Sequence, residues 1–226
     1  MTEHLNEAAA RKAVLDTALA MSRRGLSPGR SGNVSCRFSH ATHGAGMLIT
    51  PTGKAYEQTS PGDIVFVADD GRAPPGQLKP SSEWHFHLSA YQARPDRHAL
   101  VHTHSMYATV LASAHKPIPA FHYMVALAGG NDIPCVPYAA FGTEVLARHV
   151  AQGLKDRDAC LMANHGAVAL GTSLERALEL AFEIEVLAEQ YVKLLTLGPG
   201  AVHILDDGEM RRMVERFKVY GQNAQS

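Results

Sequence analysis

Apolar and polar residues follow two different rhythms along the chain, and these rhythms separate helices from strands. Apolar side chains that recur every three or four residues predict a helix, whereas alternation or a short apolar run predicts a strand. The helices predicted from this spacing or from capping residues cover 5–24, Ser81 or Ser82 to about Tyr91, 106–114, Thr143 to about Gly153, a capping box at 172–175 continuing to about Leu197, and Met210 to Phe217. The predicted strands cover 34–38, 47–49, 64–67, 99–101, 133–136, 160–162 and 167–170.

The order of these elements indicates one domain. Helices and strands are mixed along the chain, their links are short, and neither an internal repeat nor a low-complexity linker interrupts them. A length of 226 residues suits a single core. We therefore expect one α/β domain over residues 1–226, with a mixed or antiparallel central sheet flanked by helices.

Composition and charge narrow the possible partners. The formal net charge is -1 and the cationic residues are scattered, so we expect no nucleic-acid partner. The sequence has no run of about 18 apolar residues, and its first residues lack the layout of a signal peptide, so we expect no membrane association and a cytoplasmic protein. The three cysteines show no Cys-x-x-Cys spacing, which argues against a disulfide framework or a cysteine zinc finger.

A pair of histidines follows the predicted strand at 99–101. His102 and His104 are two residues apart, and residues two apart on a strand point to the same side of the sheet. Two imidazoles placed together can begin a metal site, although catalytic sites usually have three protein ligands and an open position. With 13 histidines in the chain, the pair by itself also fits a structural or surface role.

Two further residues could complete such a site. His165 lies on a predicted turn between two strands, where Gly166 allows the backbone to approach closely, and a third imidazole would suit zinc, cobalt or manganese. Glu83, near the start of a predicted helix, could ligate a metal or act as a base, or simply favour the helix dipole. His85 and His87 are rejected as a ligand pair because a helix turns residues two apart to different faces.

Small polar residues and glycines recur in three loops. Backbone N–H groups, hydroxyl groups and a helix N-terminus together can bind a phosphate. None of these loops is a P-loop, so we expect a small phosphate ester rather than a nucleotide. The residues are Gly32 and Asn33, Thr52 and Gly53, and Ser81 and Ser82.

These motifs carry a resemblance to a known family. Ser31-Gly32-Asn33-Val34-Ser35, Thr50-Pro51-Thr52-Gly53, Ser81-Ser82-Glu83-Trp84, His102-x-His104 and Asn164-His165-Gly166 occur in this order in the class II aldolase/adducin family. Residues 118–124, 129–142 and 217–221 resemble its L-fuculose-1-phosphate aldolase branch, so the resemblance covers nearly the whole chain. Any one motif is weakly specific, but the ordered set is highly specific.

The resemblance implies a site and an assembly. It implies a helix–sheet–helix (three-layer αβα) fold and homotetramers with sites between subunits. One divalent metal per subunit is implied, Zn²⁺ first and Mn²⁺ or Co²⁺ as alternatives. A tyrosine that protonates the aldehyde oxygen corresponds to Tyr123, and a second, which reaches a neighbouring subunit's site, corresponds to Tyr220. The implied metal ligands are Glu83, His102, His104 and His165, and the implied phosphate pocket is Gly32, Asn33, Thr52, Gly53, Ser81 and Ser82.

The expected activity is therefore that of a metal-dependent aldolase. It would cleave a ketose 1-phosphate, similar to fuculose 1-phosphate or to 5-deoxy- or 5-methylthioribulose 1-phosphate, into dihydroxyacetone phosphate and an aldehyde. A divalent cation can stabilise the enediolate that this reaction forms, and Glu83 can carry the proton of the donor carbon.

Two other kinds of function stay open. Family members can also act as dehydratases, epimerases or decarboxylases on sugar phosphates, although the epimerases carry Asp where this chain has Glu83. A non-catalytic adducin-type binding module would lack metal ligands, and all four are present here. The chain departs from the fuculose enzymes at Arg30, at 105–107 and in a longer hairpin at 40–44, which leaves the aldehyde undecided.

Overall fold

One mixed β-sheet forms the centre of the computed structural model, which describes residues 6–198 and 200–219. Neighbouring strands are antiparallel throughout this sheet except for the last pair, β7 and β8, which are parallel. Within the described residues the sheet has seven strands in the order β3-β2-β1-β4-β9-β8-β7. The strands are β1 (Asn33–His40), β2 (Gly44–Ile49), β3 (Val65–Ala68), β4 (Ala99–Thr103), β7 (Cys135–Val136), β8 (Ala159–Met162) and β9 (Gly166–Gly171).

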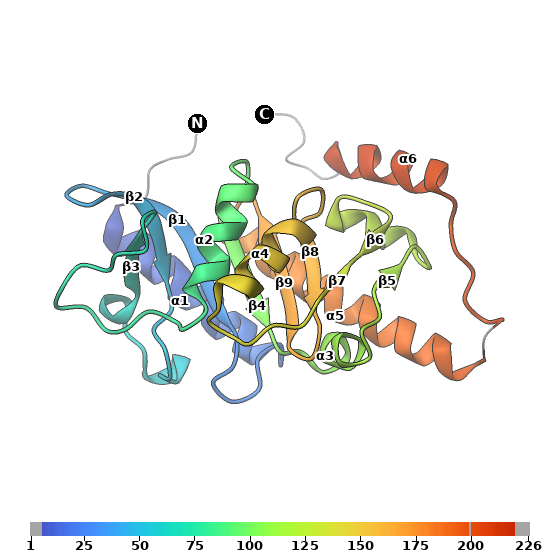
Figure 1. The fold of residues 1–226 in the computed structure, drawn as a ribbon, viewed down its shortest axis with the longest axis horizontal. Coiled ribbons are helices and arrows are strands. Elements are labelled where there is room, and N and C mark those ends of the chain that lie inside the picture. The colour runs from blue at the N-terminus through green and yellow to red at the C-terminus, as the bar shows by residue number, and fades with distance from the viewer. Residues whose placement is uncertain (1–5, 199, 220–226) are drawn as a thin grey trace.

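Helices cover both faces of the sheet and give three layers (Figure 1). One face packs against α1 (Glu7–Arg23), α3 (Met106–Ser113) and α5 (Leu174–Thr196), and the other against α2 (Trp84–Ala93) and α4 (Glu144–Gly153). Successive residues of a strand therefore enter different cores. On β4, Val101 packs in the first core and Leu100 in the second. This arrangement confirms the predicted α/β fold with a mixed central sheet.

A second group of elements lies at one end of the molecule, beyond the last strands of the sheet (Figure 1). β5 (Ile118–Pro119) and β6 (Asp132–Ile133) form a separate two-stranded sheet, and the 3₁₀ helix η3 (Tyr123–Ala128) lies between them in the sequence. Helix α6 (Asp207–Lys218) packs against η3. Two short 3₁₀ helices, η1 (Tyr56–Gln58) and η2 (Pro61–Asp63), connect β2 to β3. No described helix is long and apolar enough to cross a bilayer.

Several predicted helix starts were wrong by one to three residues: α1 begins at Glu7 rather than at residue 5, α6 begins at Asp207 rather than at Met210, and α2 and α5 also begin later than predicted. α2 begins at Trp84 with Glu83 as its N-cap, because the hydroxyl of Ser81 bonds to the Asn33 side chain and Pro80 pairs with Pro51 as a β-bridge. Residues 80–82 therefore stay outside the helix. α5 begins at Leu174, and the side chain that caps it is Ser173, which accepts from the N–H of Arg176, rather than Thr172.

Candidate metal centre

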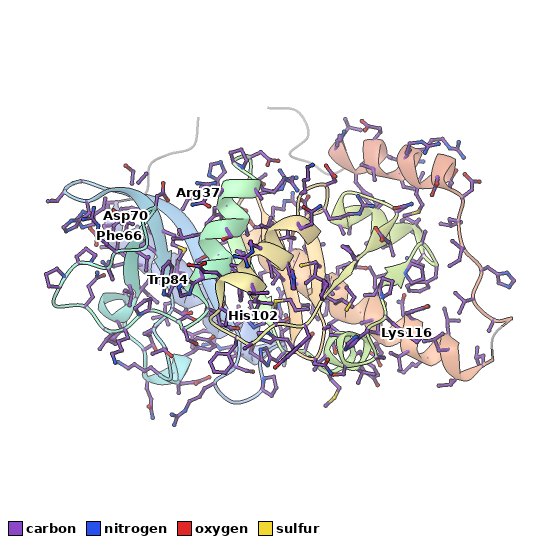
Figure 2. The ribbon with its side chains drawn as sticks, in the orientation of Figure 1. Arg37, Phe66, Asp70, Trp84, His102 and Lys116 are labelled. Carbon is purple, nitrogen blue, oxygen red and sulfur yellow. The ribbon has the colours of Figure 1, made fainter. Side chains whose placement is uncertain are left out.

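Four side chains from three separate segments converge at the end of β4. Glu83, His102, His104 and His165 each offer one ligand atom, and these atoms all lie within 4.8 Å of one another. Glu83 Oε2 is 3.2 Å from His102 Nε2, Glu83 Oε1 is 3.1 Å from His165 Nε2, and the Nε2 atoms of His102 and His104 are 2.9 Å apart. His102 lies near the middle of the molecule in Figure 2. The structure thus brings together all four predicted metal ligands.

The pairing of β4 with β9 positions His165. Thr103 lies opposite Ala167, so the turn that precedes β9 ends beside the histidine pair. Asn164 in this turn has a left-handed backbone (φ 55°), which an asparagine tolerates better than most residues. At Gly166, a Cβ atom would lie 2.2 Å from the carbonyl oxygen of Thr103, so the close approach requires glycine.

The orientation of His102 and the protonation of His104 suit metal binding. Nδ1 of His102 donates to the carbonyl oxygen of Ala167 at 2.9 Å, which directs Nε2 towards the cluster as the nitrogen available to a metal. Burial, and then the neighbouring His102 and His165, lower the pKa of His104 to about 3, so this imidazole is neutral at neutral pH. A metal ion binds the neutral imidazole.

Glu83 supplies the negative charge of the cluster. Burial raises the pKa of its carboxyl group, but the attraction of His102 and His165 outweighs burial and holds this pKa well below its usual range. Oε1 is a buried atom with no hydrogen-bond partner of good geometry among the described residues. A carboxylate oxygen with no well-formed hydrogen bond, beside three converging imidazole nitrogens, is part of a donor set that fits a divalent cation.

A cleft of about 340 Å³ is lined by three of these four residues, Glu83, His104 and His165. Arg30, Lys54, Tyr56, Tyr138 and Phe141 also line it, and the sequence analysis named none of these as site residues. The predicted phosphate-binding residues all line this cleft: Gly32, Asn33, Thr52, Gly53, Ser81 and Ser82.

Gly32 in this cleft is required by its surroundings. Its φ is +76°, and a Cβ atom there would lie 2.6 Å from the carbonyl oxygen of His102. The glycine therefore lets the loop before β1 pass directly over the strand that carries the histidine pair.

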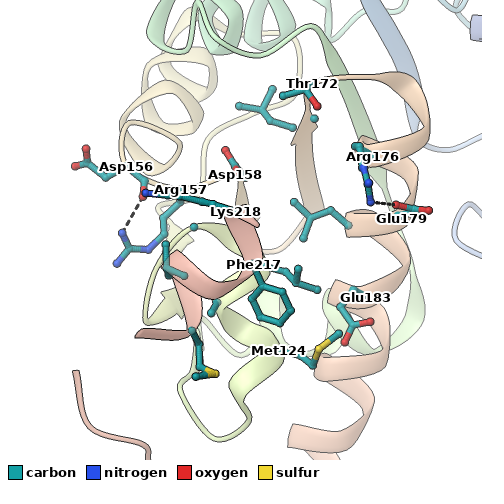
Figure 3. A pocket seen from close by; sticks show the side chains of 18 of the residues that line it. Met124, Asp156, Arg157, Asp158, Thr172, Arg176, Glu179, Glu183, Phe217 and Lys218 are labelled. Atoms are coloured by element: carbon teal, nitrogen blue, oxygen red, sulfur yellow. Dashed lines mark hydrogen bonds and ion pairs between the residues drawn. The ribbon is translucent and has the colours of Figure 1, made fainter. Parts of the chain in front are cut away.

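Of the two predicted tyrosines, Tyr123 does not line this cleft. Tyr123 begins η3, is 48% exposed and lines a separate cleft of about 1540 Å³ between η3, α5 and α6. Its ring stacks on Phe217 of α6 with centroids 6.2 Å apart, and Figure 3 shows Phe217 lining this larger cleft near Met124. Tyr220 lies outside the described residues.

Comparison with known proteins gives a consistent picture. The family model described as the class II aldolase and adducin N-terminal domain matches residues 12–192. The L-fuculose phosphate aldolase of Escherichia coli O6:H1 is 49% identical over 208 residues, which cover 92% of this chain and 94% of that protein.

A second relative carries a different substrate in its name. The 5-methylthioribulose-1-phosphate/5-deoxyribulose-1-phosphate aldolase of Rhodospirillum rubrum is 48% identical over 217 residues, which cover 96% of this chain and 95% of that protein. Among solved structures, an L-fuculose 1-phosphate aldolase superposes with a TM-score of 0.88 at 36% identity, covering 96% of this chain and 99% of that chain.

Proposed function

The chain belongs to the class II aldolase and adducin family, and we propose that it cleaves a ketose 1-phosphate into dihydroxyacetone phosphate and an aldehyde. It is a lyase of the class II aldolase type, as its relatives of nearly equal length indicate. The observation that carries the proposal is the buried cluster of one carboxylate and three imidazoles at the wall of a polar cleft.

The cluster would hold one divalent metal through Glu83, His102, His104 and His165, and we propose Zn²⁺, with Mn²⁺ or Co²⁺ as alternatives. When bound, the metal would supply positive charge that offsets the negative charge developing on the donor half as the C–C bond breaks. Glu83 would carry the proton of the donor carbon: in condensation its carboxylate would take this proton, and in cleavage it would return a proton acquired from water to the carbon left by the departing aldehyde. Its Oε1, which has no well-formed hydrogen bond among the described residues, is the oxygen that supports this role.

The phosphate of the substrate would bind at the other side of the cleft. Gly53 supplies backbone, and Thr52, Ser81 and Ser82 supply hydroxyl groups, which are groups that suit a phosphate ester. The amide of Asn33 donates to Ser81 Oγ at 3.0 Å and so positions that hydroxyl group. Arg30 adds a positive charge to this lining. A metal at one end and a phosphate at the other would fix the orientation of the bond between them.

The aldehyde half would lie towards the open side of the cleft. Tyr138 and Phe141 line it and are 60% and 69% exposed, which leaves aromatic surface for a short apolar end. The two names carried by the relatives, fuculose phosphate and 5-deoxy- or 5-methylthioribulose 1-phosphate, give the candidate substrates.

The proton at the aldehyde oxygen requires a further group. We propose Tyr123 for it, contributed by a neighbouring subunit, because Tyr123 is half exposed and lines a different cleft of its own chain. In the condensation direction this tyrosine would donate its proton to the aldehyde oxygen, and in cleavage it would take the proton back. A role for Tyr220, a homotetramer and a cytoplasmic location stay predictions.

The direct test is aldol cleavage by zinc-loaded protein. Release of dihydroxyacetone phosphate would be measured with fuculose 1-phosphate, ribulose 1-phosphate, 5-deoxyribulose 1-phosphate and 5-methylthioribulose 1-phosphate, with and without chelator. We expect chelator-sensitive release from at least one of them, and the highest kcat/KM identifies the aldehyde. H104Q, which removes a predicted metal ligand, should abolish release. The matched control is H98Q, which removes a histidine outside the metal cluster and outside the cleft.

Absence of release from every substrate by protein with one bound metal per chain would overturn the aldolase proposal. The same incubations would then be examined for dehydration, epimerisation and decarboxylation products. Release that resists chelator and survives H104Q would overturn the metal-dependent mechanism.

A further inference from the structure

A buried row of polar side chains runs inward from Glu83, away from the cleft. Asn33 Nδ2 is 2.9 Å from Glu83 Oε2, and Asn33 Oδ1 is 2.5 Å from His87 Nε2. Nδ1 of His87 is 2.7 Å from the hydroxyl of Ser35, which is 2.8 Å from the hydroxyl of Tyr91. None of the four side chains behind Glu83 belongs to a residue more than 3% exposed.

The direction of every hydrogen bond in this row follows from the Glu83 carboxylate at one end. A carboxylate only accepts, so the NH₂ group of Asn33 faces Glu83, and the same group also reaches Ser81 Oγ at 3.0 Å. The carbonyl oxygen of Asn33 therefore faces His87 and must receive the proton of Nε2. A neutral ring protonated at Nε2 has a lone pair at Nδ1, so Ser35 donates to it and Tyr91 donates to Ser35.

We infer that His87 is a positioning residue for Glu83: its Nε2–H bond holds the Asn33 amide with the NH₂ group directed at the carboxylate, and the hydroxyl groups of Ser35 and Tyr91 satisfy Nδ1 in the tautomer that this bond requires. The inference rests on the proposed function, in which Glu83 is both metal ligand and proton carrier. It assigns a role to a histidine that the sequence analysis excluded only as a member of a ligand pair.

The surroundings of His87 support this assignment. Burial, and then the neighbouring His102, lower the pKa of His87 to about 3, with Glu83 acting in the opposite direction, so the ring stays neutral at neutral pH. Both ring nitrogens already have partners within the row, which leaves neither available to a metal. Every donor in the row points towards the carboxylate, and hydrogen bonds aligned in one direction strengthen one another.

The position of the row gives it a function beyond packing. Without His87, the Asn33 amide could rotate by half a turn and direct its oxygen at Glu83 Oε2, which would repel the carboxylate from its place between His102 and His165. Groups that orient a metal ligand commonly change metal affinity or activity about 10- to 100-fold when they are removed. If His87 only filled space, a replacement of similar volume would leave metal affinity and activity unchanged.

The first experiment reads the tautomer in the wild-type protein. Long-range ¹H–¹⁵N correlation spectra of ¹⁵N-histidine-labelled protein distinguish a ring protonated at Nε2 from one protonated at Nδ1, and comparison with H87Q assigns the His87 signals. We expect a neutral ring with its proton on Nε2, both without metal and with zinc. A proton on Nδ1, or a doubly protonated ring at neutral pH, would overturn the inference.

The second experiment uses two variants that keep different halves of the imidazole. The longer side-chain amide in H87Q can reach the position of Nε2 and still donate to Asn33, whereas the shorter side chain in H87N can replace only Nδ1. Zinc affinity would be measured by competition with a chelator, together with kcat and KM for the substrate cleaved fastest. H85Q and H85N are the matched controls, because His85 lies on the same helix and the amide of Asn33 bonds to His87, Ser81 and Glu83 instead.

We expect H87N to weaken zinc binding or to lower kcat roughly 10- to 100-fold, and H87Q to stay within about threefold of the wild type. Equal behaviour of H87N and H87Q, with both folded by circular dichroism, would overturn the inference. The tautomer of His87 and the zinc affinity are both measured without substrate. Inactivity of the wild type towards every ketose 1-phosphate would therefore overturn the proposed function, whereas these two readouts would still decide the role of His87.

Discussion

At the scale of single residues, individual hydrogen bonds and close backbone contacts position the groups at the cleft. His102 is directed by its bond to Ala167, and Gly32 and Gly166 permit backbone approaches that no side chain would allow. Arg30 is different, because its guanidinium donates to the carbonyl oxygen of Gly53, at 3.1 Å, rather than to a carboxylate. The other cation that lines the cleft, Lys54, is paired with Asp63 at 2.7 Å. Arg30 is therefore the cation there that no described carboxylate neutralises.

Replacing Arg30 by Gln should weaken binding of the substrate phosphate. We expect R30Q to raise KM for the ketose 1-phosphate about tenfold with little change in kcat, since a charged hydrogen bond contributes about 1.5–3 kcal/mol and solvent reduces this at an exposed site. R30K keeps the charge and should lie between R30Q and the wild type. Inhibition by inorganic phosphate, measured in parallel, should weaken by a similar factor. An unchanged KM and an unchanged inhibition constant in R30Q would contradict a phosphate contact.

At the scale of elements, the cleft is held by contacts between segments that are distant in sequence. Helix α3 begins two residues after His104, and its N-cap Ser105 makes no side-chain capping bond. The carboxylate of Glu185 on α5 replaces that cap by accepting from the N–H groups of Tyr107 and Ala108, at 2.8 and 2.9 Å. On the phosphate side, Asp63 of η2 binds Ser60 and Lys54, which fixes the loop that follows Gly53.

Asp63 should make the stability of this loop depend on pH. Hydrogen bonds from Lys54 and from the backbone and hydroxyl of Ser60 lower the pKa of Asp63 to about 2. Because an unfolded aspartate has a pKa of about 3.9, the stabilisation is complete above that value and is lost as pH falls towards 2. We expect D63N to lower the melting temperature by about 2–6 °C at pH 7, corresponding to about 1–2 kcal/mol after allowance for partial exposure. The difference in melting temperature between D63N and the wild type should disappear near pH 2. Thermal unfolding would be measured from pH 2 to 7, and a difference that stays constant over this range would refute the prediction.

At the scale of the whole molecule, the metal cluster and Tyr123 occupy different clefts of one chain. Tyr123 lies with η3 and α6, beyond the last strands of the sheet, whereas the metal cluster lies at the end of the central strand β4. If Tyr123 serves the reaction, it serves a site on another copy of the chain. Two inactive variants should therefore restore each other's activity when they assemble together.

Mixing Y123F with H104A tests this arrangement. A working site would need His104 from one chain and Tyr123 from its neighbour, so random co-assembly in equal amounts should recover about a quarter of wild-type activity. The control is a mixture of H102A and H104A, which lack ligands of the same site and should recover nothing. Full activity of Y123F alone, or no recovery above the control mixture, would contradict a tyrosine shared between subunits.

Local patterns were enough to identify much of this protein. Alternation of apolar and polar residues, or a short apolar run, predicted the strands. Because side chains two apart on a strand share one face, the sequence also predicted that His102 and His104 lie together. Their order with the other motifs identified the family, which the comparisons confirm. The sequence also singled out six residues, predicted to bind phosphate, that all line the cleft in the structure.

Only the tertiary structure decided which distant residues meet. The register of β4 with β9 sets His165 beside the histidine pair, and no spacing along the chain encodes that register. The hydrogen bond that Asn33 donates to Ser81 keeps Ser81 out of α2, and the packing of β1 against α2 places His87, Ser35 and Tyr91 behind Glu83. Spacing along a chain describes neighbours within one element, whereas these contacts depend on how separate elements pack, and packing is a property of the whole core.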